Sequence, residues 1–585
     1  MPAPCFLIHA DNAYSLETNR FASTGNVTMY DLWDSYLPQY ERAMTRGGAA
    51  GTMCSYFSMR IEGSPGLVYV PSCSDEYLLT EIVRNYWNRP DATHLTDCGA
   101  VWSQAYGNNY VKNLTLAAAA SINSGCDMNS NTITPTQLGL AVQLGLVNPL
   151  TVRATAARVL AQRFRTGHFD PLETPAAQGL LALGAADIGT SVSRALAADG
   201  VAQGLVLVKN DNGALPIARG KRVALLGPQG NSFDALRGDC YCSGYCAEGS
   251  ACFPSLETAV TSANVGGTTV TFAGVTTNGG NDSSWGAAIA AVAASDVVIL
   301  ALGTDIGTAQ EGGDRSSIGL PGLQEAFGVA VLQAATAAKV PVVLLLLHNL
   351  PASFDLLVRP ADGSYKAVDA IVDAWAPTAY ADTVAAALFG GLNRFGKATM
   401  TVYPKAYAAA QSIFEFSMTK PPGRSYKYYD GSVGAPLIEF GSGKSYSTFN
   451  ISCLGGLAPG DPVVHIDCEV SNTAGPDGDE VLMAFHRPSA AIVGRVAGAH
   501  PLPLRALVEF ERVSVAAGAV GTVHFDIAAS EAFAFVNEDG ASVIYPGLHF
   551  IDVSNGNGAN ITIPCIVESE AAVVVKAPPK RSSAS

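Results

Sequence analysis

The sequence predicts a multidomain α/β protein that ends in a β-sandwich. Two observations set this fold class. Short apolar runs alternate with helical stretches up to about residue 405, and from about residue 450 the pattern changes to alternating strands separated by turns. At 585 residues the chain is too long for one hydrophobic core. Its 48% hydrophobic and 15% charged residues are typical of a globular chain.

Residues 1–170 alternate strand-like and helix-like pieces, which indicates βα repeats. The pattern predicts helices at 31–43, 76–87, 114–123 and, as two helices, within 134–165, with strands at 50–56 and 93–96. Gly167 and Pro171 supply a helix C-cap and a breaker, and so end this unit.

Residues 188–405 are predicted to form an α/β domain around a buried sheet. Its strands are apolar runs at 223–227, 297–302 and 340–347, and helices are expected at 287–294 and 324–338. Fully apolar strands that alternate with helices are typical of a mainly parallel sheet covered on both faces.

Residues 450–570 are predicted to form a β-sandwich, because short strands with period-two alternation are separated by turn residues. These strands are expected at 463–470, 480–486, 506–513, 521–527 and 547–553. Residues 406–449 connect the two units as a linker. The tail, 571–585, ends in a stretch rich in Pro, Lys, Arg and Ser and is predicted to be disordered.

The charge and the apolar runs exclude two classes of partner. A net charge of −15 argues against a nucleic-acid partner, since polyanions are bound by basic surfaces. The run Val340–Leu347 is far shorter than the roughly 20 apolar residues of a membrane span, so no membrane span is expected.

The twelve cysteines indicate an oxidising compartment. Four lie in one loop, as Cys240, Cys242, Cys246 and Cys252, and three more are in the last domain, as Cys453, Cys468 and Cys565. A metal site is the alternative for the loop, but the spacing is irregular for zinc and no histidine flanks it, so disulfides are favoured. Glycosylation sequons point the same way, at Asn26, Asn113, Asn281, Asn450 and Asn560.

Two acidic motifs stand where α/β folds place their chemistry. Asp97 directly follows the expected strand 93–96, and Glu311, in Glu311-Gly312-Gly313-Asp314-Arg315, follows the apolar run 297–302. Hydrolysis of a glycosidic bond with retention needs two carboxylates about 5 Å apart, one as nucleophile and one as acid/base. The alternatives are ordinary loop acids, with Asp97 as a helix N-cap.

The motifs around these acids resemble glycoside hydrolase family 3, in particular its β-xylosidase and α-arabinofuranosidase branch. The resemblance rests on a series of segments in the right order: Met53-Cys54-Ser55-Tyr56, Thr96-Asp97-Cys98, the stretch GVAQGLVLVKNDNGALP at 200–216, EGGDRSSIGLPGLQ at 311–324, PGRSYKYY at 422–429 and FGSGKSY at 440–446. It spans about residues 5 to 555.

The resemblance implies a function and a site. Asp97 is expected to be the nucleophile and Glu311 the acid/base, with Asp314 and Arg315 as an ion pair that orients the loop. His9, Arg20 and Tyr56 are expected to bind the sugar, although packing or a surface role is the alternative for all three. The substrate is expected to be an oligosaccharide with β-linked xylose or α-linked arabinose at its non-reducing end. No cofactor and no metal are implied, and the location is extracellular.

The resemblance also implies three domains: a TIM barrel, an α/β sandwich and a fibronectin type III-like domain. A complete barrel needs ~250 residues, whereas residues 1–170 match only its C-terminal part. A secreted protein should open with a signal peptide, and residues 1–20 show none. The chain is therefore expected to lack its beginning, and a half-barrel with open edges should not be stable alone. The alternatives to an active xylosidase are a β-glucosidase of the same family and an inert carbohydrate-binding relative.

Overall fold

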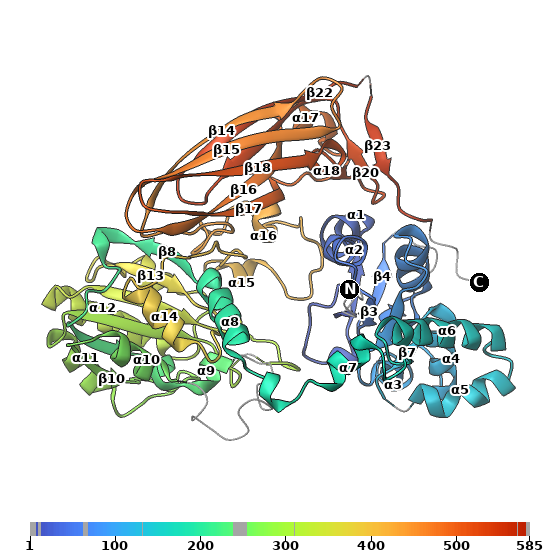
Figure 1. Cartoon of the computed structure of the whole chain (residues 1–585), viewed down its shortest axis with the longest axis horizontal. Helices are drawn as coiled ribbons and strands as arrows, with labels where there is room; N and C mark the ends of the chain where they lie inside the picture. The colour runs from blue at the N-terminus through green and yellow to red at the C-terminus, as the bar shows by residue number, and fades with distance from the viewer. Residues whose placement is uncertain are drawn as a thin grey trace.

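The computed structural model describes residues 13–62, 68–131, 133–237, 254–308, 310–569 and 571–580, and the backbone of 7–9. The chain forms an N-terminal α/β domain, a middle α/β domain and a C-terminal β domain. Figure 1 shows these in blue to cyan, green to yellow, and orange to red. The β domain lies across the other two (Figure 1).

The N-terminal domain is built on a parallel sheet of four strands within the described residues, in the order β1-β3-β6-β7. Its strands are β1 (Leu7–His9), β3 (Gly51–Cys54), β6 (Thr93–Thr96) and β7 (Met128–Asn129). A Cβ at Gly51 would lie 1.7 Å from the Thr93 carbonyl oxygen, so only glycine lets β3 and β6 approach this closely. A second, smaller sheet contains β2 (Thr24–Val27), β4 (Ser58–Ile61) and β5 (Val70–Pro71).

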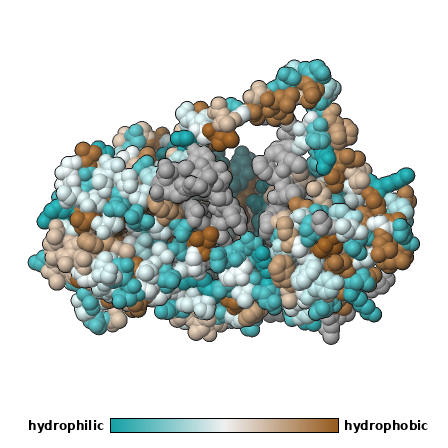
Figure 2. All heavy atoms as spheres, turned by 90° about the horizontal axis from the view of Figure 1, so that it is seen from below, coloured by the Kyte–Doolittle hydropathy of each residue, from teal (hydrophilic) through white to brown (hydrophobic). Residues whose placement is uncertain are grey.

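The predicted helices of this domain are present, and α3 (Ala100–Tyr106) is a further helix that the sequence did not predict. The expected helix 31–43 is observed as three consecutive elements, of which the third begins at Pro38, because proline has no N–H to continue the hydrogen-bond ladder of the preceding turn. The main helical elements are α1 (Met29–Asp31), η2 (Leu32–Tyr36), α2 (Pro38–Thr45), η4 (Tyr77–Tyr86), α3 (Ala100–Tyr106), α4 (Leu114–Ser124), α5 (Ile133–Gln143) and α6 (Pro149–Arg165). Leu144, Leu150 and Phe164 of this domain are exposed. Figure 2 shows the molecule from below, with apolar residues in brown on this face.

The middle domain confirms the buried sheet that its apolar runs predict. The described residues form six strands in the order β10-β9-β11-β12-β13-β8, parallel except for the edge strand β8. They are β8 (Val206–Asn210), β9 (Arg222–Leu226), β10 (Thr268–Phe272), β11 (Val297–Gly303), β12 (Val342–Leu347) and β13 (Ala370–Asp373).

Each central strand is apolar throughout because both of its faces are buried. Along β11, Val297 and Ile299 pack into one hydrophobic cluster, and Val298 and Leu300 pack into a second cluster on the opposite face. The helices around the sheet are α8 (Ser191–Gly204), α9 (Phe233–Arg237), α10 (Leu256–Ala263), α11 (Trp285–Ala293), α12 (Gln324–Ala338), α13 (Asp355–Val358) and α14 (Ala381–Leu388).

Residues 171–204 connect these two domains through α7 (Pro175–Leu181) and α8, which the sequence did not predict. In the part of the chain that the structure describes, no single helix is long and apolar enough to cross a membrane. The segments Pro175–Leu181 and Ala185–Gly204 reach that length only together, and they are bent by 86°.

The C-terminal domain is a β-sandwich. Within 448–567 one sheet has the order β14-β15-β18 and the other has the order β17-β16-β21-β22. The strands are β14 (Thr448–Leu457), β15 (Val463–Ala474), β16 (Gly478–Pro488), β17 (Ala506–Val515), β18 (Val520–Ala528), β21 (Gly547–Ser554) and β22 (Asn560–Val567). Cys453 and Cys468 lie opposite each other on β14 and β15 and form a disulfide, whereas Cys565 is a buried free thiol.

The prediction that residues 571–585 form a disordered tail is wrong for the first part of this segment. Val573–Lys576 forms strand β23, which pairs with β20 (Ser542–Ile544) in a small sheet that also contains β19 (Phe535–Val536). Three consecutive valines favour a strand, and β20 offers them a free edge. Residues 581–585 lie outside the described residues.

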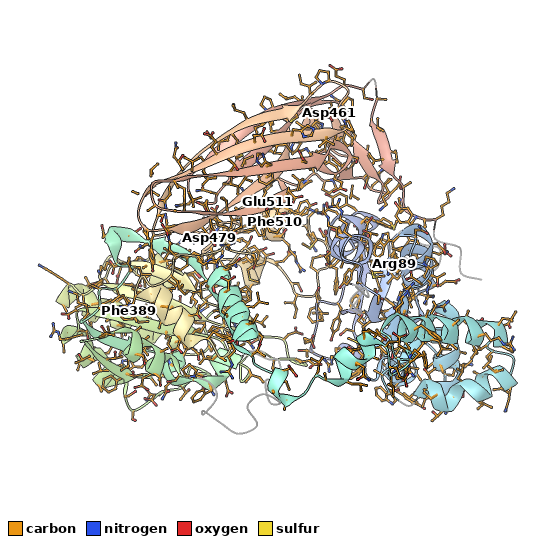
Figure 3. All side chains as sticks on the ribbon, viewed as in Figure 1. Arg89, Phe389, Asp461, Asp479, Phe510 and Glu511 are labelled. Atoms are coloured by element: carbon orange, nitrogen blue, oxygen red, sulfur yellow. A yellow bond between two sulfur atoms is a disulfide. The ribbon has the colours of Figure 1, made fainter. Side chains whose placement is uncertain are left out.

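Contacts from the linker and the β domain complete the N-terminal domain. Phe416, from the linker 406–449, packs inside its core with its ring 5.1 Å from that of Phe57. Lys427 donates a 2.8 Å hydrogen bond to Asp34. On the other side, Asp479 of β16 accepts hydrogen bonds from Arg394 and Arg512 where the β domain meets the middle domain (Figure 3).

Candidate active site

Asp97 lies directly after β6, at the carboxyl end of the parallel sheet. Its backbone N–H donates to the Cys54 carbonyl of β3 at 3.0 Å, and its Oδ1 accepts from the Cys98 N–H at 2.6 Å. The N-cap of α3 is Gly99, in a left-handed conformation, with no side-chain capping bond. Asp97 is therefore not the helix N-cap that the alternative proposed, and its half-buried carboxylate stands at the end of the sheet.

Tyr56 is buried beside Asp97. Its hydroxyl donates to the Cys98 carbonyl oxygen at 2.7 Å, and only 3% of the residue is exposed. Burial, and then the charge of Asp97, raise the pKa of Tyr56, so the hydroxyl stays protonated and can donate. Phe21 packs against the ring at 4.6 Å.

Arg20 joins this group to the middle domain. Its guanidinium carbon lies 4.9 Å from the centre of the Tyr56 ring, and its Nη1 donates to Glu311 Oε1 at 2.5 Å. Burial lowers the pKa of Arg20, but the hydrogen bond with Glu311 and the interactions with Tyr14 and Tyr56 together outweigh this, and the pKa is raised overall. The side chain of Arg20 is 19% exposed.

Glu311 reaches this place from the loop that follows β11. Its side chain is 62% exposed, and the loop is held by hydrogen bonds to the N-terminal domain. Asp314 accepts from the backbone N–H groups of Glu17 and Thr18, at 3.1 and 2.8 Å to Oδ2. The expected Asp314–Arg315 ion pair is therefore wrong, and Arg315 instead donates to the Gly319 carbonyl at 2.5 Å.

His9 stands at the end of β1, opposite Met53 of β3, and Met53 in turn lies opposite Leu95 of β6. This register brings His9 to the same end of the sheet as Asp97, two residues beyond Leu95. Asp97, Tyr56, Arg20 and Glu311 form a chain of contacts, and the backbone of His9 lies at the same end of the sheet as Asp97.

The sequence did not single out Tyr14, Glu17 and Thr18, which belong to the same group. Tyr14 donates from its hydroxyl to Glu17 at 3.2 Å, and Glu17 also accepts from Arg20 at 3.3 Å. The signal that could have found them is the spacing of Tyr14, Glu17 and Arg20 every third residue in a stretch without hydrophobic periodicity.

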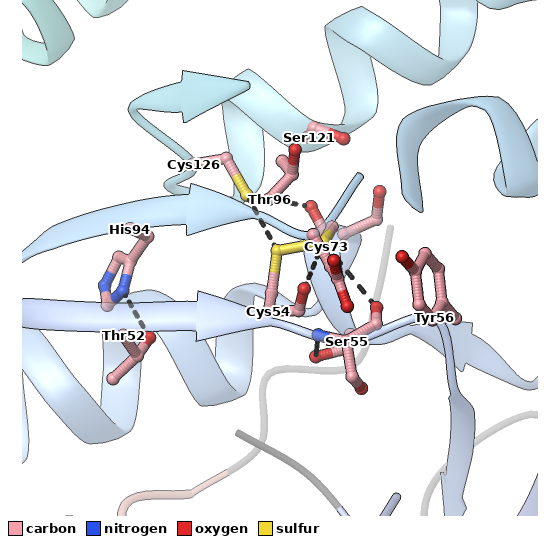
Figure 4. The surroundings of a disulfide bond; sticks show 12 residues. Thr52, Cys54, Ser55, Tyr56, Cys73, His94, Thr96, Ser121 and Cys126 are labelled. Carbon is pink, nitrogen blue, oxygen red and sulfur yellow. Dashed lines mark hydrogen bonds between the residues drawn. A yellow bond between two sulfur atoms is a disulfide. The ribbon is translucent and has the colours of Figure 1, made fainter. Parts of the chain in front are cut away.

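A cluster of sulfur atoms lies at the end of β3, the strand that pairs with β6 next to Asp97. Cys54, the last residue of β3, is disulfide-bonded to Cys73, and the Cys126 sulfur lies 3.6 Å from that of Cys54 (Figure 4). These are the His, Cys, Asp and Glu side chains in the described residues that are grouped closely enough to hold a metal ion, and two of the three are already joined to each other. Cys240, Cys242, Cys246 and Cys252 lie outside the described residues.

Comparison with known proteins agrees with this architecture. Residues 205–446 match the Glycosyl hydrolase family 3 C-terminal domain, and residues 486–556 match the Fibronectin type III-like domain. A Beta-D-xylosidase 1 of Arabidopsis thaliana is 30% identical over 585 residues, covering 93% of this chain and 71% of that one. An exo-1,4-beta-xylosidase of Emericella nidulans is 29% identical over 570 residues, covering 93% of this chain and 70% of that one.

Solved structures show the same fold. A family 3 exo-beta-xylosidase in complex with a xylobiose aziridine activity-based probe superposes with a TM-score of 0.81 at 22% identity, covering 96% of this chain and 71% of that one. A beta-glucosidase from Listeria innocua in complex with glucose gives a TM-score of 0.73 at 24% identity, covering 94% and 71%.

The α/β domains, the C-terminal β-sandwich and these relationships define an exo-acting O-glycosyl hydrolase. The relative from Arabidopsis, at 30% identity over more than two thirds of its length, fixes the family. The chain belongs to glycoside hydrolase family 3.

Proposed function

We propose that this protein releases β-linked xylose, or α-linked arabinose, from the non-reducing ends of xylan-derived oligosaccharides with retention of configuration. One observation carries the proposal: the contacts of Tyr56 and Arg20 bring Asp97 and Glu311, which are 214 positions apart in the sequence, to one site. The xylosidase relatives support the choice of sugar.

Asp97 acts as the nucleophile and Glu311 as the acid/base in this proposal. In the first step an Asp97 oxygen bonds to the anomeric carbon, the glycosidic C–O bond breaks, and the leaving oxygen takes a proton from Glu311. In the second step Glu311 removes a proton from water, whose oxygen attacks the anomeric carbon and releases Asp97. The buried Tyr56 hydroxyl beside Asp97 helps to hold the nucleophile.

The domain boundaries and the remaining sugar contacts belong to the same proposal. Residues 1–170 correspond to the C-terminal part of a TIM barrel, 188–405 to an α/β sandwich, and 450–570 to a fibronectin type III-like domain after the linker 406–449. His9, Arg20 and Tyr56 bind the sugar at the carboxyl ends of the barrel strands. An extracellular location is supported by the disulfides Cys54–Cys73 and Cys453–Cys468.

The test uses the whole chain with p-nitrophenyl β-xyloside, α-arabinofuranoside and β-glucoside. We expect the xyloside or the arabinofuranoside to be hydrolysed, and NMR of the first product should show the configuration of the substrate. Faster hydrolysis of the glucoside would assign the protein to the β-glucosidases. Binding of xylobiose without any turnover would make it an inert carbohydrate-binding relative.

Two variants test the residue roles. Asp97→Ala should abolish hydrolysis, whereas Glu311→Ala should slow natural oligosaccharides far more than activated aryl glycosides and be partly rescued by azide. Glu325→Ala serves as the matched control, because it removes a carboxylate of the same domain that hydrogen-bonds only within that domain, to the Leu356 N–H at 2.9 Å. Unchanged activity of Glu311→Ala on oligosaccharides would assign the acid/base elsewhere.

A further inference from the structure

Arg20 is shared between two carboxylates. Its Nη1 lies 2.5 Å from Glu311 Oε1 and 3.3 Å from Glu17 Oε2. A general acid must carry a proton when the leaving group departs, and protonation removes the charge of Glu311 that attracts Arg20, so the ion pair between Glu311 and Arg20 is lost at that point. Glu17 is the carboxylate to which Arg20 can turn without leaving the site.

Glu17 also holds the Glu311 loop in place. Its Oε2 accepts a 3.0 Å hydrogen bond from the N–H of Gly312, the residue next to Glu311. The segment Glu17–Thr18 also binds Asp314. The Asp314 carboxylate accepts hydrogen bonds from the backbone N–H groups of Glu17 and Thr18, and the Asp314 N–H donates to Thr18 Oγ1 at 2.9 Å. These bonds surround Glu311 and span the two domains.

We propose that Glu17 is a positioning residue for Glu311: it docks the Glu311 loop on the N-terminal domain and takes over Arg20 when Glu311 becomes protonated. The proposal rests on the proposed role of Glu311 as acid/base. Besides Arg20 and Glu17, the titratable and charged groups around this point are Tyr14, Tyr56, Asp97, Asp314 and Arg315.

Two substitutions separate the two tasks. Glu17→Gln keeps an oxygen that accepts from Gly312 but removes the charge that attracts Arg20, whereas Glu17→Ala removes both. In Glu17→Gln, Arg20 stays on Glu311, so the alkaline limb of the kcat/KM pH profile should move to lower pH. Its kcat should fall more for poor leaving groups than for activated ones. A merely structural residue would not move the pH profile.

Amide hydrogen exchange tests the docking whether or not substrate is turned over. Glu17→Ala should raise exchange at Gly312 about 10-fold, as expected for the loss of one hydrogen bond, while Glu17→Gln should leave it near the native rate. Asp314→Asn is the matched control: it weakens docking but leaves Arg20 between its two carboxylates, so it should raise exchange without moving the pH profile.

Unchanged exchange in Glu17→Ala would overturn the proposal, even in an active protein. An unchanged pH profile and leaving-group dependence in Glu17→Gln would overturn it as well. Normal exchange effects together with an absence of any hydrolysis by the native chain would instead overturn the proposed function.

Discussion

Removing the carboxylate of Asp127 should open the N-terminal domain. Asp127 follows α4, directly after Cys126, and its side chain is fully buried between Arg84 and Arg158, at 2.6 and 2.8 Å. It also accepts from the His94 N–H of β6 at 3.0 Å. Burial raises the pKa of Asp127 and lowers that of Arg84, which means that burial disfavours the charged form of each group. Each charge is therefore stabilised by the other.

The magnitude follows from this burial. Asp127→Ala leaves Arg84, which is 8% exposed, without its carboxylate, and breaking a buried pair in this way costs about 3–5 kcal/mol. Asp91 is the matched control in the same domain, since it also pairs with two arginines, Arg89 and Arg165, but its side chain is 29% exposed. An exposed pair of this kind contributes roughly 0.2–1 kcal/mol.

Native-state amide exchange of β6 is the assay, because it reports the opening of one domain within a multidomain chain. Asp127→Ala should speed exchange of the β6 amides by about a hundred- to several-thousand-fold, and Asp91→Ala by less than about tenfold. Equal effects of the two variants, or a change below about 1 kcal/mol for Asp127→Ala, would refute the reasoning.

Two further predictions concern the β domain. His486 and His549 are hydrogen-bonded to each other at 2.9 Å, and burial lowers the pKa of both. Below pH about 6.5 the two histidines therefore bind protons in the unfolded chain but not in the folded one. The free energy of unfolding, measured with urea, should be highest above that pH and fall as the pH decreases. A free energy of unfolding that does not change with pH would contradict this. A Cβ at Gly540 would lie 2.5 Å from the Trp33 ring, so Gly540→Ala should lower the melting temperature, whereas Gly558→Ala, which has open space and a similar positive φ, should lower it less.

The sequence predicted best where burial alone decides the structure. The fully apolar runs located β11 and β12 to within two residues, because both faces of each strand are buried. It failed at α8 and β23. Val192 and Leu196 on α8 are largely exposed, so the helix has no clear apolar face, and β23 is a short strand whose partner is set by tertiary contacts.

The candidate site shows the same division. Local sequence places Asp97 and Glu311 each beyond the carboxyl end of a parallel strand, Asp97 in the sheet of the N-terminal domain and Glu311 in the sheet of the middle domain. The contact of Glu17 with Asp314 joins positions 297 apart along the chain, through a loop with no periodic pattern. Only the packing of the two domains brings the segment that contains Glu17 to the loop that contains Glu311. No local sequence signal encodes this packing.

The insertion of Phe416 into the N-terminal core has a consequence for synthesis on the ribosome. The ring of Phe57 finds its partner 359 residues later in the chain. At roughly 5–20 residues per second, translation therefore leaves this core unfinished for about 20 to 70 s. During that time the nascent N-terminal domain exposes apolar surface that chaperones can bind, and its folding can be completed only once the middle domain and the start of the linker have been made.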